Sequence, residues 1–218
     1  MTEPLRIIGE AFDARAPHYD ESAMHRDVAA AVAGFVALDD VSRVVDMATG
    51  TGLVLRALSG RATGVDLIGV DISPGMLGIA REALPTAEWI EADAAALPLP
   101  DSSADLVTCV TALHIIPSVA QAAVEWKRVL RPGGRLVTAT FAGPVPRAPV
   151  PPHGASDAPY RRDHEPYADP ETLATTFGRL GFRLTRHTEW SDDIDTVLIA
   201  ELVTASAPDE PVDAASAP

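Results

Sequence analysis

The stretch VVDMATGTGLVL, residues 44–55, decides the fold of this chain. Its β-branched start predicts a strand over Arg43–Met47, and the small residues that follow predict a turn. The apolar run from about Leu53 predicts a helix. A strand, a small-residue turn and a helix in this order open a nucleotide-binding α/β unit, so the turn is expected to hold a nucleotide-like ligand.

Beyond this unit, short β-branched runs alternate with helical patterns, which predicts a parallel sheet wrapped by helices. The expected strands lie at residues 43–47, 65–71, 87–93, 104–111, 135–141, 182–190 and 194–203. The last two are joined by the short turn SDD and are expected to form an antiparallel pair. The prediction is therefore an α/β fold whose seven strands are mostly parallel, with the last strand antiparallel.

Helix starts and stops are also visible in the sequence. Ser73 is expected to cap a helix that carries Pro74 in its first turn. A second helix is expected to open at Pro117, and a third to start at Asp169 and end at Gly181.

The chain is expected to form a single domain over residues 1–204. Its first part, residues 1–40, predicts one or two helices that cap the sheet. The proline-rich residues 143–169 predict a functional lid loop, and residues 205–218 have the composition of a disordered tail.

The formal net charge of −14 argues against nucleic acid or an anionic membrane as a main partner. The single cysteine, Cys109, excludes an intramolecular disulfide and is expected to be buried, and no metal site is indicated. The N-terminus lacks a signal-peptide pattern, and Pro117 interrupts the charge-free run Leu106–Val124. A cytoplasmic location is therefore expected.

Polar residues recur where the predicted strands end, which is the edge at which open parallel sheets bind ligands. These residues are Asp46, Asp71, Asp93 and Thr111. A single aspartate at a strand end is more often a turn former or a helix cap. Three aspartates at the ends of three successive predicted strands favour a ligand-binding role.

A dinucleotide is disfavoured because Leu55 stands where the third glycine of G-x-G-x-x-G should be, and no G-K-[ST] follows for a P-loop. Asp46 would repel a phosphate but would suit an ammonium group. Asp71 suits a ribose diol, and Asp93 suits the exocyclic amine of an adenine. S-adenosylmethionine combines these three groups.

At these residues the chain resembles the class I S-adenosylmethionine-dependent methyltransferases. It is similar to the small-molecule branch that includes the ubiquinone and menaquinone biosynthesis enzymes. The matching stretches are FDARAPHYD, VVDMATGTG, GVDISPGMLGIAREAL, IEADAAALPLPDSSADLVTCVTALHII and EWKRVLRPGGRLVTATF, which cover about Phe12 to Phe141. The resemblance implies a Rossmann-like fold, S-adenosylmethionine as cofactor and S-adenosylhomocysteine as product.

The resemblance also implies a role for each matching position. Asp46, Gly50 and Gly52 match the turn under the methionine part of the cofactor, while Ala48 replaces the first glycine of that motif. The remaining cofactor positions are Asp71 at the ribose, Ile72 and Met76 on the adenine, Asp93 and Ala94 at its edge, Tyr19 as a cover and Thr111 beside the reacting methyl.

Methyl transfer requires that the acceptor be held in line with the C–S bond, and some acceptors also need a base. His114, three residues after Thr111, is the candidate base, although a packing role at a strand end is about as good an interpretation. Five further residues are candidates for acceptor binding or are simply solvent-facing: His18, His153, Tyr160, His164 and Tyr167.

The Asn/Asp-Pro-Pro-Tyr/Phe signature of amino-methyltransferases is absent, since the position reads TALH. The expected acceptor is therefore a small molecule that is methylated on oxygen or carbon, in a pocket that is open or completed by a second copy in a homodimer. The alternative is a cyclase or rearrangement enzyme that keeps the fold and the cofactor but transfers no methyl. A non-enzymatic binding protein is disfavoured by the intact acidic triad.

Overall fold

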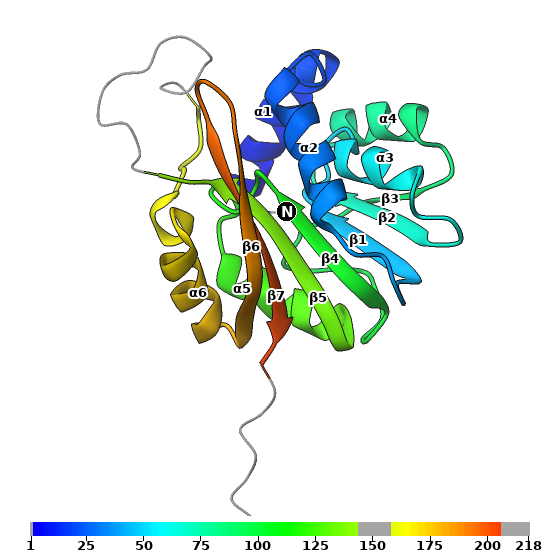
Figure 1. The fold of residues 1–218 in the computed structure, drawn as a ribbon. Coiled ribbons are helices and arrows are strands. Elements are labelled where there is room, and N and C mark those ends of the chain that lie inside the picture. The colour runs from blue at the N-terminus through cyan, green and yellow to red at the C-terminus, as the bar shows by residue number, and fades with distance from the viewer. Residues whose placement is uncertain (1, 144–157, 206–218) are drawn as a thin grey trace, which may run out of the picture.

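The computed structural model describes residues 2–143 and 158–205. Its strands form one sheet in the order β3-β2-β1-β4-β5-β7-β6 (Figure 1). The elements are α1 (Glu3–Tyr19), α2 (Ala23–Phe35), β1 (Arg43–Met47), α3 (Leu53–Ser59), β2 (Asp66–Asp71), α4 (Pro74–Ala83), β3 (Glu88–Glu91), β4 (Ala104–Val110), α5 (Val119–Val129), β5 (Leu130–Phe141), the 3-10 turn η1 (Glu165–Tyr167), α6 (Pro170–Arg179), β6 (Phe182–Ser191) and β7 (Thr196–Thr204).

Strand β1 lies in the middle of the parallel part of the sheet, between β2 and β4. The strand order reverses at this point, because β2 and β3 extend to one side and β4 and β5 to the other. Strand β7 runs antiparallel to both β5 and β6. The predicted α/β fold, with seven mostly parallel strands and the last strand antiparallel, is confirmed.

Helices cover both faces of the sheet, and β1 is therefore buried on both sides. Val45 and Met47 point into the core shared with α5 and α6. Val44 points into the opposite core, which α2 and α3 complete. The alternation of β1 between two cores leaves only its carboxyl end, with the turn that follows, free to meet a ligand.

The predicted helix caps are confirmed at Ser73 and Asp169, whose side chains accept the backbone N–H of Met76 and Thr172. Helix α5 begins at Val119 rather than at Pro117, because the Ser118 side chain caps it.

The strand boundaries differ most from the prediction at β3 and β5. Strand β3 ends at Glu91, so Asp93 lies in the loop beyond it. Strand β5 begins at Leu130, which pairs with Ala104 before an irregularity in the ladder, and regular pairing with β4 resumes at Arg135.

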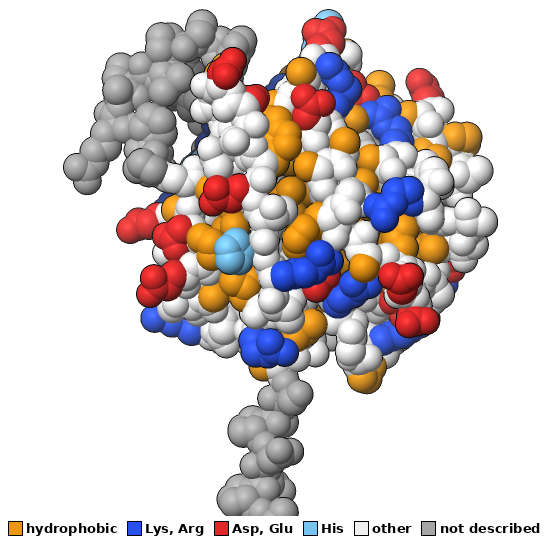
Figure 2. Space-filling model, in the orientation of Figure 1, with side chains coloured by type: hydrophobic (Ala, Val, Ile, Leu, Met, Phe, Trp, Pro, Cys, Tyr) orange, Lys and Arg blue, Asp and Glu red, His pale blue; other side chains and the backbone are white. Residues whose placement is uncertain are grey.

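The N-terminal segment forms two helices, as predicted, and the first of them begins at Glu3. Most of the expected lid (residues 144–157) and nearly all of the expected tail (206–218) lie outside the described residues. Cys109 is fully buried, as expected. Among the described helices, none combines the length and apolar character that a membrane crossing would need. On the face drawn in Figure 2, acidic and basic side chains are interspersed.

Candidate active site

A cavity of about 680 Å³, including its open mouth, lies at the carboxyl ends of β1, β2 and β4. Its walls come from α1, the turn after β1, the ends of β2 and β4, the loop after β3 and the approach to α5. The lining residues are Leu5, Ile8, Phe12, Tyr19, Ala48, Gly50, Val70, Asp71, Ile72, Ala92, Asp93, Ala94, Val110, Thr111, Ala112, Ile115, Ile116 and Pro117.

The turn after β1 is built from left-handed residues. Ala48, Gly50 and Gly52 have φ values of 51°, 57° and 79°. Ala48 and Gly50 line the cavity, whereas Gly52 does not. A Cβ on Gly52 would lie 2.4 Å from the Trp89 ring, so this glycine serves the turn and the packing of Trp89. The predicted cofactor contact at Gly52 is therefore not matched by its placement.

Asp46 is buried beneath the turn and does not line the cavity. Its carboxylate accepts hydrogen bonds from the hydroxyls of Thr49 at 2.6 Å and Thr108 at 2.5 Å. Burial raises the pKa of Asp46 to about 6, although the two hydroxyls oppose this shift. In this structure Asp46 therefore ties the turn to β4, and the expected contact with an ammonium group does not follow from its position.

Asp71, at the end of β2, lines the cavity. Its carboxylate accepts the backbone N–H of Gly50 at 2.7 Å and of Ser73 at 2.9 Å. Burial raises the pKa of Asp71, and these N–H groups oppose the shift. A carboxylate offers about four acceptor positions, so it retains capacity for hydroxyl groups of a ligand.

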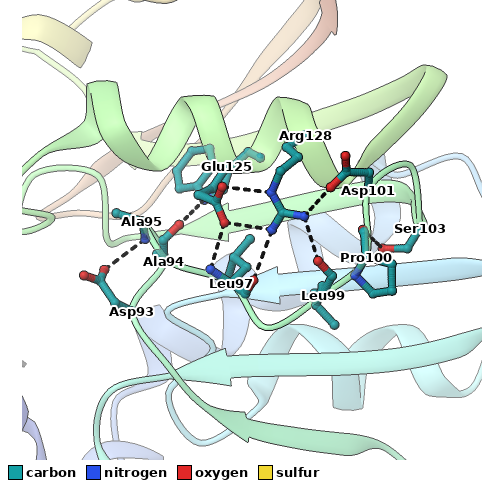
Figure 3. A network of polar contacts seen from close by, with 11 residues as sticks. Asp93, Ala94, Ala95, Leu97, Leu99, Pro100, Asp101, Ser103, Glu125 and Arg128 are labelled. Atoms are coloured by element: carbon teal, nitrogen blue, oxygen red, sulfur yellow. Dashed lines mark hydrogen bonds and ion pairs between the residues drawn. The ribbon is translucent and has the colours of Figure 1, made fainter.

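The loop after β3 brings Asp93 and Ala94 to the cavity and is held by α5 (Figure 3). Asp93 accepts the N–H of Ala95 at 2.9 Å. The indole N–H of Trp126 donates to the Ala94 carbonyl at 3.1 Å. Glu125 accepts the N–H of Leu97 at 2.9 Å. Helix α5 thus holds Ala94 and the loop around it, while Asp93 is fixed by the turn of the loop itself.

Arg128 is the centre of this network (Figure 3). Its guanidinium donates to the carbonyls of Leu97 and Leu99 and forms ion pairs with Asp101 at 2.7 Å and Glu125 at 2.8 Å. Hydrogen bonding to Arg128 lowers the pKa of Glu125. Sequence reasoning missed this support, although the three-residue spacing of Glu125 and Arg128 on a predicted helix was a usable signal.

Ile72 lines the cavity as expected, but Met76 is fully buried and does not. The N–H of Met76 donates to the capping hydroxyl of Ser73 in the first turn of α4. The Met76 side chain lies on the buried face of this helix. The predicted adenine contact of Met76 is therefore not matched.

Helix α1 supplies a wall that the sequence prediction did not assign. Leu5, Ile8 and Phe12 line the cavity from one face of this helix, and their helical spacing was the available signal. Asp13 fixes the helix over α4, because it accepts the Ser73 hydroxyl at 2.6 Å and the Gly75 N–H at 2.8 Å.

Tyr19 and Thr111 both line the cavity, as predicted. Burial raises the pKa of Tyr19 to about 12, and the Thr111 side chain is one of the groups that oppose this shift. Thr111 adopts a left-handed φ of 52°, and its N–H donates to the Ala139 carbonyl at 2.7 Å. A strained residue at a ligand-facing strand end is a common feature of functional sites.

His114 is 9% exposed and lies beside the cavity rather than in its lining. Its ring stacks on His164 with 4.2 Å between centroids, and its carbonyl accepts the N–H of Asp163 at 2.8 Å. Burial, with smaller contributions from His164 and Arg162, lowers the pKa of His114 to about 3. His114 is therefore neutral at physiological pH, and its Nδ1 atom is buried without a partner among the described residues.

The other predicted acceptor residues have different environments. Tyr160 stacks on Phe12 at 6.0 Å and so reaches the cavity wall. Tyr167 packs in the core and is 5% exposed, because η1 folds under α6. His18 is exposed and pairs with Glu21 at 2.8 Å, away from the cavity. The placements of Tyr167 and His18 do not match the prediction, and His153 lies outside the described residues.

Comparison with known proteins shows what the central part of the chain is similar to. Residues 45–138 match a family model described as a methyltransferase domain. A demethylmenaquinone methyltransferase of Thermus thermophilus is 41% identical over 123 residues, which are 55% of this chain and 53% of the relative. The chain spans about half the length of the curated relatives it matches.

Two solved structures share the fold of this chain. A chain of the complex between the Haloferax volcanii Trm112 methyltransferase activator and a methyltransferase gives a TM-score of 0.72 at 20% identity, over 89% of this chain and 98% of that one. The [4+2]-cyclase SpnF gives a TM-score of 0.64 at 19% identity, over 84% and 82%.

The residues of this site fit S-adenosylmethionine. Asp71 offers acceptor capacity for the ribose hydroxyls at the cavity wall. Asp93 and Ala94 stand beside Ile72, which supplies an apolar surface for adenine. The Gly50 backbone lies open to the cavity, since a Cβ there would approach only Tyr19, at 3.9 Å. The donor and acceptor types thus agree with this cofactor.

Proposed function

We propose that the chain is an S-adenosylmethionine-dependent methyltransferase that acts on a small-molecule acceptor. The observation that carries this proposal is the convergence of Asp71, Asp93 and the turn at Ala48 and Gly50 on one cavity in a methyltransferase domain. The Thermus thermophilus relative is named a demethylmenaquinone methyltransferase, which supports a small-molecule acceptor.

When bound, S-adenosylmethionine would supply an electrophilic methyl group on a sulfonium. Asp71 would hold the ribose, and Asp93 with Ala94 would hold the adenine edge. Leu5, Ile8 and Phe12 of α1 exclude water from one side of the cavity. The chain's main contribution would be to hold the acceptor atom in line with the transferred group.

Tyr19 and Thr111 define where the acceptor meets the cofactor. The neutral Tyr19 hydroxyl, with its pKa raised to about 12, remains a hydrogen-bond donor or acceptor across physiological pH. Tyr19 lines the cavity from the end of α1, and Thr111 lines it directly after β4. We infer that they orient the acceptor group for attack.

His114 would act in the same region as a neutral hydrogen-bonding group. With a pKa near 3 it is a weak base, and proton transfer is most efficient when the pKa of the base lies near the working pH. An acceptor that ionises readily by itself would need little help from such a base. This property supports methylation of an acidic oxygen or an activated carbon.

The direct test is to incubate the full chain with S-adenosylmethionine and a library of small phenols, quinols and carboxylic acids. We expect S-adenosylhomocysteine to form together with one methylated product. Asp71→Ala should abolish both signals at the same cofactor concentration. Binding of the cofactor with no methylated product from any library member would favour the cyclase or rearrangement alternative.

A further inference from the structure

We propose that the acceptor is a planar molecule with a carboxylate group, which Arg15 and Arg162 bind at the mouth of the cavity. This inference rests on the proposed function and names the chemical class of its acceptor. The two arginines come from helix α1 and from the segment before η1, which are far apart in the sequence.

A pair of stacked rings joins the two arginines. Phe12 lines the cavity and stacks on Tyr160, with 6.0 Å between centroids and 25° between ring planes. The Arg15 guanidinium lies 4.9 Å from the Phe12 ring centre. The Arg162 guanidinium lies 5.5 Å from the Tyr160 ring centre. Two cations and two aromatic faces therefore gather at one wall of the cavity.

Both guanidinium groups lack an acidic partner within the described part of the chain. Only four described arginines form neither an ion pair nor a side-chain hydrogen bond with described residues: Arg15, Arg162, Arg179 and Arg183. Two of these four arginines, Arg15 and Arg162, lie against the stacked rings of Phe12 and Tyr160. Carboxylates are abundant on a chain with a net charge of −14, so two arginines without an acidic partner at one place are notable.

The acidic side chains near these arginines are engaged with other groups. Asp13 accepts from Ser73 and Gly75. Asp20 accepts the hydroxyl of Thr51 and pairs with Arg56. Asp163 lies 3.7 Å from Arg161. Asp13 and Asp20 are thus held by α4 and α3.

Three of the buried side-chain atoms that have no hydrogen-bond partner among the described residues belong to one group of neighbouring side chains, in which His114 stacks on His164. They are the Nε of Arg162, the Nδ1 of His114 and the Nδ1 of His164. Buried polar atoms normally have hydrogen-bond partners, so unpaired ones in a native fold call for an explanation. A ligand that accepts from Arg162 and meets the stacked histidines would supply these partners.

The chemistry of these groups selects the ligand. Guanidinium forks match the geometry of a carboxylate, often with two parallel hydrogen bonds. Phe12 and Tyr19 line the cavity, and aromatic rings also pair edge to face, so these side chains favour a flat ring over a flexible chain. A cationic or fully aliphatic acceptor would leave the arginines unpaired.

The test is a calorimetric comparison of matched ligands. A set of one- and two-ring aromatic carboxylates and their primary amides would be titrated into the full chain, with and without S-adenosylhomocysteine. We expect at least one acid to bind about tenfold tighter than its own amide, as charge-assisted hydrogen bonds imply. Raising the salt concentration should reduce this difference.

Arg15→Gln and Arg162→Gln should each weaken binding of that acid about fivefold to tenfold while S-adenosylhomocysteine affinity stays unchanged. Arg183→Gln, an exposed arginine on β6, is the matched control and should change neither affinity. Equal affinity of acids and amides, failure of every acid to bind, or an equal effect of the control would overturn the inference. Failure of S-adenosylhomocysteine to bind the wild type would instead overturn the proposed function. The titrations of acids and amides without S-adenosylhomocysteine would then still test the carboxylate site.

Discussion

The two halves of the cavity differ in how well their polar groups are satisfied. In the cofactor half, residues 46–94, Asp46 accepts two hydroxyls and Asp71 accepts two backbone N–H groups. In the acceptor half, made of α1, residues 111–114 and residues 158–164, nitrogen atoms of His114 and Arg162 are buried without partners among the described residues. The cofactor half is built before its ligand arrives, whereas the acceptor half lacks partners that a ligand can supply.

The difference also concerns sequence distance. The cofactor half comes from three successive strand–turn units and is organised by local turns and caps. The acceptor half depends on contacts between segments far apart, such as the stack of Phe12 on Tyr160. Substitutions in the first half should therefore change cofactor affinity or stability, and those in the second should change turnover or acceptor binding.

The strongest change is expected from Asp71→Ala in the cofactor half. Loss of two hydrogen bonds from a carboxylate to ribose hydroxyls should weaken S-adenosylhomocysteine binding by roughly a hundredfold or more, since each is worth about 1.5–3 kcal/mol. Calorimetry measures the affinity, and circular dichroism checks the fold. Asp66→Ala, at the exposed start of the same strand, is the control. Unchanged affinity in Asp71→Ala would show that this carboxylate does not face the cofactor.

His114→Ala tests the acceptor half. We expect turnover to fall about tenfold, at the low end for a residue that positions or accepts a proton, with S-adenosylhomocysteine affinity within about twofold of wild type. Because the pKa of His114 is near 3, the wild-type rate should show no His114 titration between about pH 5 and 8. Steady-state kinetics against pH measures both effects. A variant that keeps full turnover would assign His114 to packing alone.

Asp46→Asn tests the cofactor half through the pH dependence of the unfolding free energy. Burial raises the folded pKa of Asp46 from 3.8 to about 6, so the folded state binds this proton more tightly than the unfolded state. The stabilising effect is complete below about pH 4 and is lost as pH rises through 6, and it amounts to about 3 kcal/mol.

Asparagine cannot ionise, so the Asp46→Asn variant should lose less stability than wild type between about pH 4 and 6. Urea unfolding at several pH values measures this difference. If the unfolding free energy of both proteins changed equally with pH across that window, the raised pKa of Asp46 would be contradicted.

The smallest change is expected from Ala48→Gly. Alanine in the left-handed region is strained, and glycine relieves the strain at some cost in unfolded-chain entropy. We expect a net gain of about 0.5 kcal/mol in unfolding free energy. Ala57→Gly, inside α3, should instead lose about 1 kcal/mol. A loss of stability in Ala48→Gly would mean that the turn does not strain this residue.

In the cofactor half the sequence predicted the local structure, because its signals are local, but not the burial of Asp46, Gly52 and Met76 away from the cavity. The bounds of β1, the cap at Ser73 and the exposure of Asp71 to the cavity all follow from residues within one turn of the chain. The inward position of Met76 was missed because α1 packs over α4 and sets which face of that helix is buried.

The acceptor half was predicted less well because its contacts are long-range. The polar, proline-rich segment gave no sign that Tyr167 enters the core or that His164 stacks on His114. The cavity wall from Leu5 and Ile8 required knowledge of where α1 lies relative to the sheet. Periodicity identifies such a helix but does not say which surface it covers.

A calorimetric titration of the full chain with S-adenosylmethionine, S-adenosylhomocysteine and NAD tests the cofactor assignment most directly. We expect each sulfur nucleotide to bind at one site per chain and NAD to give no measurable heat of binding, because Leu55 replaces the third glycine of the dinucleotide turn. Absence of binding by both sulfur nucleotides, or binding of NAD in their place, would contradict the methyltransferase assignment.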